Sequence, residues 1–260
     1  MNEPKILVGC PVYEGTKYCI DRFIDSLNKL SYKNKEILLV DNSDADEFFN
    51  ELKSKGINII KDSNKDLFKM ARVVSSRNLI ISYAIENNFD YLMMMDADVI
   101  LPENAIEELL SSNKDIVSGL YHNYSSINGK LRPLPVALKL LTEEEFAEAK
   151  SKYSLPDYVQ TRFHMPRHLA PEEVASDALQ EVFICCGGCM LASRDAFSKI
   201  KYSCQEENGK IKVADDISFL RDARNLGFQI FCNTKVKCDH LLAGKYNVDS
   251  DGNFIHPWAT

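Results

Sequence analysis

Short apolar runs alternate with segments of helical periodicity along the first two thirds of the chain. This alternation predicts β-α-β units, in which helices connect the strands of a largely parallel sheet. The predicted strands span 5–10, 36–41, 58–61, 91–96 and 116–120. The predicted helices span 16–30, 44–54, 75–88 and 103–112, the last with Pro102 in its first turn. The expected fold class is therefore α/β, with a mostly parallel central sheet flanked by helices.

Residues 122–180 lose this regular alternation. Five prolines interrupt the segment, and only the acidic stretch 142–152 keeps a helical pattern. The segment is therefore predicted to be an insertion or flap on the sheet.

Regular patterning returns after the insertion. An apolar run covers 182–192, a helical pattern covers 216–226, and short strand-like runs cover 229–232 and 236–240. A C-terminal tail, 241–260, follows, in which Asp251-Gly252 predicts a hairpin turn.

Size and charge narrow the functional classes. At 260 residues the chain is expected to form a single catalytic domain. The net charge of -7, without a basic stripe, argues against nucleic acid as a partner. No signal peptide and no transmembrane segment are predicted, so the protein is interpreted as cytoplasmic, with peripheral membrane contact left open.

The chief chemical candidate is Asp96-Ala97-Asp98, which directly follows the apolar run 91–95. A buried strand that ends in two carboxylates delivers them to the carboxyl edge of the sheet, where open α/β folds bind ligands. Such carboxylates can share a divalent cation with the oxygens of a diphosphate. Two further Asp-x-Asp matches lack a preceding strand: Asp44-Ala45-Asp46 is explained by helix capping, and Asp249-Ser250-Asp251 lies in the predicted hairpin.

Two further groups could complete a site. Asp215 and Asp216 precede a helical pattern, where they either cap the helix or provide a base that takes a proton from an acceptor hydroxyl. His240 ends a strand-like run and is either structural or a third metal ligand. Gly187-Gly188 permits close approach to a sugar or marks a bulge in a strand.

Zinc is a weaker interpretation. Cys185, Cys186 and Cys189 lack a second matching pair, and Pro166 separates His164 from His168. The eight cysteines are expected to be mostly reduced thiols.

In their order along the chain, these signals resemble a GT-A type glycosyltransferase of the family 2 kind. The matching segments are Gly9-Cys10-Pro11-Val12-Tyr13-Glu14-Gly15, Leu39-Val40-Asp41-Asn42-Ser43, Ser76-Arg77-Asn78, Met95-Asp96-Ala97-Asp98, Val117-Ser118-Gly119-Leu120-Tyr121, Cys186-Gly187-Gly188-Cys189-Met190-Leu191, Asp215-Asp216-Ile217-Ser218-Phe219 and Asp239-His240-Leu241. The resemblance covers nearly the whole chain except 122–180 and the tail.

The resemblance implies roles for individual residues. The donor-binding residues it implies are Pro11, Val12, Tyr13, Asp41, Arg77, Asp96 and Ala97. It implies that Asp96, Asp98 and His240 hold Mn²⁺ or Mg²⁺. Asp216 maps to the catalytic base, with Asp215 as its alternate, where the family usually has Glu. Arg77 is expected in a first helical turn, capped by Ser75 or Ser76, facing the donor.

The implied activity is metal-dependent transfer of a sugar from a nucleoside-diphosphate donor to an acceptor hydroxyl on a glycan, lipid or small molecule, with inversion. Retaining enzymes share this fold, which leaves the stereochemistry open. A sugar nucleotidyltransferase is the nearest rival, although it needs a Gly-rich, Arg-containing loop near its start, and a non-catalytic carbohydrate-binding homologue is another. A dinucleotide-binding oxidoreductase needs a glycine-rich turn where this chain has Pro11 and Tyr13.

Overall fold

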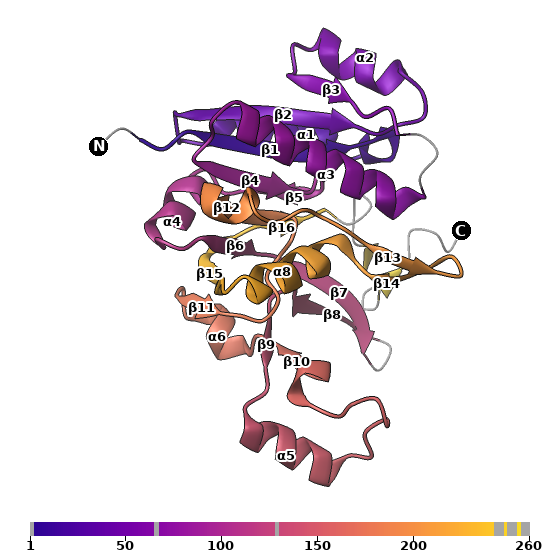
Figure 1. The fold of residues 1–260 in the computed structure, drawn as a ribbon, viewed down its shortest axis with the longest axis vertical. Coiled ribbons are helices and arrows are strands. Elements are labelled where there is room, and N and C mark those ends of the chain that lie inside the picture. Colours follow the sequence, from indigo (N-terminus) through magenta and orange to yellow (C-terminus); the bar gives the residue numbers. More distant parts are fainter. Residues whose placement is uncertain (1–2, 65–67, 128–129, 242–246, 249–253, 256–260) are drawn as a thin grey trace.

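A computed structural model of the protein describes residues 3–64, 68–127, 130–241, 247–248 and 254–255. An eight-stranded sheet with the order β11-β15-β6-β12-β4-β1-β2-β3 forms its centre, and helices pack on it (Figure 1). The strands of this sheet are β1 (Ile6–Val12), β2 (Lys35–Asp41), β3 (Ile59–Lys61), β4 (Tyr91–Met95), β6 (Ile116–Leu120), β11 (Leu179–Glu181), β12 (Cys189–Ser193) and β15 (Ile230–Lys237). No helix in the described ranges is both long and apolar enough to cross a bilayer.

The five strands predicted in the first half of the chain are confirmed. Strands β1, β2, β3 and β4 pair in parallel, and β6 pairs in parallel with β15. Six of the seven residues of β1 and all five of β6 are buried, as expected for strands covered on both faces. The apolar runs of the sequence therefore form the centre of the hydrophobic core.

The later strands make the sheet mixed. Strand β12 inserts between β4 and β6 and runs antiparallel to both. Only the end of the apolar run 182–192 is a strand, because residues 182–188 form a loop that leads into β12. The runs 229–232 and 236–240 are not two separate strands: β15 begins in the first run and ends at Lys237 in the second, and β16 (Asp239–His240) pairs with β5 (Val99–Ile100).

The six predicted helices are present, some with a different extent, and the described residues contain further short helices. The helices are η1 (Glu14–Thr16), α1 (Ile20–Lys29), α2 (Glu47–Ser54), α3 (Lys69–Glu86), α4 (Ala105–Ser111), α5 (Glu143–Lys152), η2 (Arg162–His164), α6 (Pro171–Ala175), α7 (Arg194–Phe197) and α8 (Asp215–Asn225). Helix α3 begins at Lys69 rather than at residue 75, packing on β1 and β2. Pro102 lies before α4 rather than in its first turn, where its carbonyl accepts from the Ala105 amide at 3.0 Å.

The weakly patterned segment 122–180 contains regular structure. It holds the hairpin β7 (His122–Ile127) and β8 (Lys130–Pro135), the pair β9 (Leu138–Leu140) and β10 (Pro166–His168), and helices α5 and α6. Helix α5 lies at the end of the molecule opposite α2 and β3 (Figure 1). Its predicted position is confirmed, and Thr142 caps it through a reciprocal pair of hydrogen bonds with Glu145.

Two small hairpins complete the fold: β13 (Gln205–Glu207) with β14 (Lys210–Val213), and β17 (Asn247–Val248) with β18 (Phe254–Ile255). The turn predicted at Asp251-Gly252 and the Asp249–Asp251 motif lie outside the described residues. The division of the chain into a catalytic domain, an insertion and a tail stays a prediction.

Candidate active site

The carboxyl edges of β1 and β4 meet at a pocket of about 340 Å³. Six of the residues selected from the sequence line it: Pro11, Tyr13, Asp96, Ala97, Asp98 and His240. Its other lining residues were missed: Thr16, Tyr18, Asn42, Val73, Tyr121 and Asn123. Tyr121 and Asn42 lie within the quoted motifs, whereas the others have no distinguishing sequence signal. The fold therefore gathers the acidic motif, the first loop and the C-terminal histidine in one place.

Asp98 and His240 face each other in this pocket. Strand β16 sets His240 opposite Val99 on β5, next to Asp98 in the chain. Its Nε2 lies 3.5 Å from Asp98 Oδ2, while its Nδ1 is 3.2 Å from the carbonyl oxygen of His122. Because the carbonyl can only accept, Nδ1 carries a proton. Nε2 faces the Asp98 carboxylate, to which it donates when the ring is protonated, and it can act as a metal ligand when the ring is neutral.

The charge state of the pair follows from its contacts. Burial alone raises the pKa of Asp98, but the hydrogen bond and charge of His240 outweigh it and lower this pKa below its usual value. Burial lowers the pKa of His240, whereas Asp98 raises it, and the net shift is upward. The Tyr18 hydroxyl also donates to Asp98 Oδ2 at 3.3 Å. Asp98 is therefore held ionised at neutral pH.

Asp96 turns partly away from this pair, toward α3. Its Oδ1 accepts from Arg77 Nη2 at 2.6 Å, and its side chain is 39% exposed. Burial raises the pKa of Asp96, and Arg77 opposes this rise. No group of three His, Cys, Asp or Glu side chains in the described part of the chain is arranged to hold a metal. The predicted trio of Asp96, Asp98 and His240 is thus only partly assembled.

Arg77 lies in the interior of α3 and is only 4% exposed. The prediction that Ser75 or Ser76 caps its helix is wrong, because α3 begins at Lys69. Besides Asp96, Arg77 pairs through Nε with Asp215 Oδ2 at 3.1 Å. Its Nη1 has no hydrogen-bond partner among the described residues, and contact with a donor stays a prediction.

Asp215 and Asp216 occupy the first turn of α8 but have different surroundings. Asp215 is 6% exposed and committed to Arg77. Asp216 accepts only from the Ile217 amide among the hydrogen bonds described, at 2.7 Å. Burial, followed by the charge of Asp215, raises the pKa of Asp216. Of the two carboxylates, Asp216 is the one available to a substrate.

The close packing of Asp96 and Asp216 against the loop before β12 requires glycine at positions 187 and 188. A Cβ at Gly188 would lie 2.5 Å from Asp96 Oδ2, and one at Gly187 would lie 2.7 Å from the Asp216 Cβ. Backbone bonds fix the contact, since the Asp96 amide donates to the Gly188 carbonyl at 3.0 Å. The pair lies in the loop before β12, not in a strand, and leaves room for both acidic side chains.

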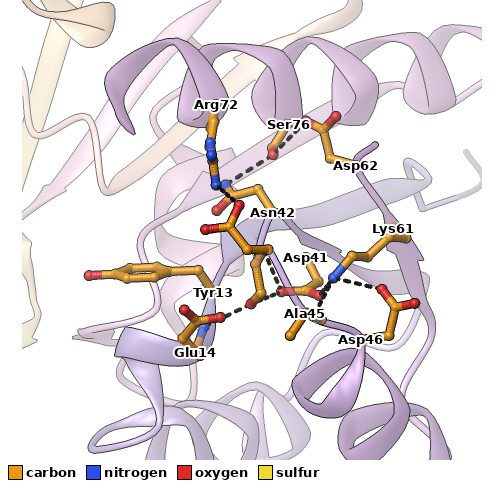
Figure 2. A network of polar contacts seen from close by, with 12 residues as sticks. Tyr13, Glu14, Asp41, Asn42, Ala45, Asp46, Lys61, Asp62, Arg72 and Ser76 are labelled. Atoms are coloured by element: carbon orange, nitrogen blue, oxygen red, sulfur yellow. Dashed lines mark hydrogen bonds and ion pairs between the residues drawn. The ribbon is translucent and has the colours of Figure 1, made fainter. Parts of the chain in front are cut away.

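A second pocket, of about 310 Å³, adjoins the first and shares Tyr13, Asn42 and Val73 with it. Asp41 lies below it, fully buried, and binds Ser43 and the Lys61 ammonium, the latter at 2.7 Å (Figure 2). Val12 is also fully buried, and neither Val12 nor Asp41 lines these two pockets, so their contact with a donor stays a prediction. Asp41 instead supports the loop that carries Asn42 and Ser43.

The motif Asp44-Ala45-Asp46 lies beside this second pocket. The predicted N-cap position is confirmed for Asp46 at the start of α2, but its side chain makes no capping hydrogen bond. Asp46 pairs with Lys61 at 3.3 Å, and Asp44 pairs with Arg72 at 2.6 Å (Figure 2).

In the comparison with known protein families, one family model matches this chain. A family model described as "Glycosyl transferase family 2" matches residues 8–201. No curated protein matches the sequence directly.

Two solved structures share the fold. One is described as GalNAc-T7 with UDP, GalNAc and Mn²⁺, with a TM-score of 0.59, 12% identity, and coverage of 92% of this chain and 44% of that one. The other is the mannosyltransferase PcManGT from Pyrobaculum calidifontis in complex with GDP-Man and Mn²⁺, with a TM-score of 0.54, 13% identity, and coverage of 92% and 57%. The predicted GT-A fold is confirmed, although this chain spans only about half the length of either structure.

Proposed function

Because the chain belongs to glycosyl transferase family 2, we propose that it transfers a sugar from a nucleoside-diphosphate donor to an acceptor hydroxyl, with a divalent metal and with inversion. The observation that carries this proposal is the pocket in which Asp98 and His240 lie 3.5 Å apart, between Tyr13 and Asp96. The acidic motif proposed to hold the metal and the donor diphosphate lines this pocket, and the neighbouring loop with Gly187 contacts the proposed base, Asp216.

The two adjoining pockets suit an elongated donor. The second pocket, with Asn42 and Ser43, offers polar groups for a nucleoside, and the first brings the diphosphate to the acidic motif. The similar structures hold UDP and GDP-Man, each with Mn²⁺. These ligands support a nucleotide sugar as the donor of this chain.

The side chains of the first pocket fit a divalent cation. A carboxylate oxygen and an imidazole nitrogen already face each other in Asp98 and His240, and such ions complete their coordination with substrate phosphates and water. Asp96 is the third proposed ligand, through the oxygen not bound by Arg77. A bound cation would stabilise the negative charge on the departing nucleoside diphosphate.

Asp216 is the proposed base. The acceptor oxygen forms a bond to the anomeric carbon while the bond from that carbon to the diphosphate oxygen breaks, and the hydroxyl proton passes to Asp216. The raised pKa of Asp216 makes its carboxylate a stronger proton acceptor than an exposed aspartate. A single displacement of this kind inverts the anomeric centre.

Calorimetry tests the donor site directly. We expect UDP or GDP to bind only when Mn²⁺ or Mg²⁺ is present, and Asp98→Asn to abolish this binding. Asp25→Asn, which changes an exposed aspartate on α1, is the matched control and should bind as the wild type does. Equal nucleotide affinity with and without metal, or in Asp98→Asn, would remove Asp98 from the site.

Product analysis separates the proposal from its rival. Incubation with a nucleotide sugar and an acceptor should release a nucleoside diphosphate, whereas a nucleotidyltransferase would form a nucleoside triphosphate from pyrophosphate. An NMR spectrum that shows the donor's anomeric configuration retained in the product would defeat the assignment of Asp216.

A further inference from the structure

A third pocket lies between the segment 122–180 and the last helix of the main fold. Its volume is about 660 Å³, roughly twice that of either donor pocket. Lys139 on β9 and Phe163 on η2 form one wall, and Arg221 and Arg224 on α8 form another. Phe183, in the loop that leads to β12, closes the remaining side.

The two arginines of this pocket have few strong ion pairs. Arg224 forms no ion pair with any described carboxylate; its Nη1 donates to the Phe183 carbonyl, and burial lowers its pKa. Among the described carboxylates, Arg221 pairs with its chain neighbour Asp222, at 3.0 Å on the surface, a contact that contributes little. Lys139 is paired with Glu173, whereas Glu181 at the rim keeps its negative charge, because its hydrogen bond comes from the neutral Gln229 amide. Arg221 and Arg224 are therefore the groups of this pocket that can bind an anion.

Aromatic rings lie beside the arginines. Phe163 is 56% exposed, and its ring centroid lies 6.0 Å from that of Phe183. The guanidinium of Arg224 stacks on Phe183, with Cζ 3.9 Å from the ring centroid. A pocket with flat apolar surfaces and a few fixed polar groups is typical of small-molecule recognition. The C–H face of a pyranose ring fits such a surface, and a planar guanidinium matches a carboxylate or phosphate.

Helix α8 and the loop before β12 connect the pocket with the proposed base. Asp216 and Arg224 lie eight positions apart on α8, roughly 12 Å along the helix at about 1.5 Å per residue. The loop that carries Phe183 continues to Gly187, whose missing Cβ leaves room for Asp216. An acceptor of several sugar units is long enough to span this distance.

We propose that the third pocket binds an anionic sugar unit of the acceptor, with its ring on Phe163 and its carboxylate or phosphate on Arg221 and Arg224. This inference rests on the proposed glycosyltransferase function. It predicts that the acceptor is a negatively charged saccharide. The charged unit is a different sugar from the one to which the donor sugar is transferred.

NMR titration of the isotope-labelled full chain tests the pocket with simple probes. Methyl glucuronide should shift the signals of residues 163, 181–183 and 221–225 and bind about tenfold more tightly than its neutral analogue methyl glucoside. Glucose 6-phosphate tests phosphate as the source of the charge; whichever anionic probe binds more tightly identifies the group.

Variants distinguish a specific binding site from non-specific electrostatic attraction between an anionic probe and the protein. Arg221→Gln should weaken the anionic probes about tenfold, because it removes an exposed arginine of the pocket without opening the core. Arg22→Gln, an exposed arginine on α1, should leave binding unchanged. Phe163→Ala should weaken charged and neutral sugars alike. Equal affinity for methyl glucuronide and methyl glucoside, or full affinity in Arg221→Gln, would overturn the proposal.

The outcome is independent of the donor test. Metal-dependent nucleotide binding that needs Asp98, together with no preference for anionic sugars, would refute only the acceptor assignment. Binding of anionic sugars at Arg221, without metal-dependent nucleotide binding, would refute the proposed function and with it the role of this pocket in an acceptor.

Discussion

Replacing Arg77 by Met should strongly destabilise the protein, because Arg77 is the counter-ion of two carboxylates. It is 4% exposed, 2.6 Å from Asp96 and 3.1 Å from Asp215. Met keeps the length of the side chain but leaves Asp215, itself 6% exposed, without a compensating charge. Removal of one partner from a buried ion pair costs about 3–5 kcal/mol, out of a typical total stability of about 5–15 kcal/mol.

Thermal unfolding at neutral pH measures this loss. With about 2–4 °C per kcal/mol in a domain of comparable size, Arg77→Met should lower the melting temperature by roughly 6–20 °C. Arg77→Lys should lie between this variant and the wild type, because a single ammonium cannot match the fork of a guanidinium. Arg22→Gln, which removes an exposed arginine, should change stability little.

A double-mutant cycle identifies the cause. Asp215→Asn in the Arg77→Met background removes the uncompensated charge, so the double variant should be less destabilised than the sum of the two single variants. Additive losses, or an Arg77→Met protein within about 1 kcal/mol of the wild type, would show that the two carboxylates do not depend on Arg77.

Three further predictions address the site and its surroundings. Gly188→Ala should abolish metal-dependent nucleotide binding by calorimetry, because its Cβ would lie 2.5 Å from Asp96 Oδ2; unchanged affinity would mean that the loop adjusts freely. Asp216→Asn should eliminate turnover but keep nucleotide binding. In the wild type, kcat should fall as the pH drops through the raised pKa of Asp216, because only the ionised carboxylate can accept a proton. A pH-independent kcat, or an active Asn variant, would exclude Asp216 as the base. Thr142→Ala should cost about 1 kcal/mol in chemical denaturation by removing the 3.1 Å cap from the Glu145 amide, and no change would show that α5 contributes nothing to global stability.

The sequence predicted best what depends on local patterns. The five early strands are nearly continuous apolar runs, and such runs are typical of strands that are buried on both faces. Helix α5 was predicted from the helical pattern of the acidic stretch 142–152, and the cap that the structure shows between Thr142 and Glu145 is also local. The site residues at strand ends, such as Asp98, followed once those strands were identified.

Predictions failed where distant segments decide the outcome. The start of α3 at Lys69 lacks a capping side chain, and its position depends on packing against the sheet. Arg77 was expected in a first helical turn facing the donor, because nothing local in the sequence shows that Asp96 and Asp215 meet around it. Similarly, the antiparallel direction of β12 depends on its neighbours β4 and β6 rather than on its own residues.

The position of β12 also has a consequence for synthesis of the chain. Strands β4 and β6 appear early from the ribosome, yet they do not pair with each other, because residues 189–193 fill the space between them. Until β12 emerges, one edge of β4 has no hydrogen-bonding partner, and both edges of β6 are unpaired, because its other neighbour, β15, comes later still. Unpaired strand edges of this kind favour intermolecular association. The middle of the sheet therefore forms after its N-terminal strands, and these edges stay exposed in the nascent chain until then.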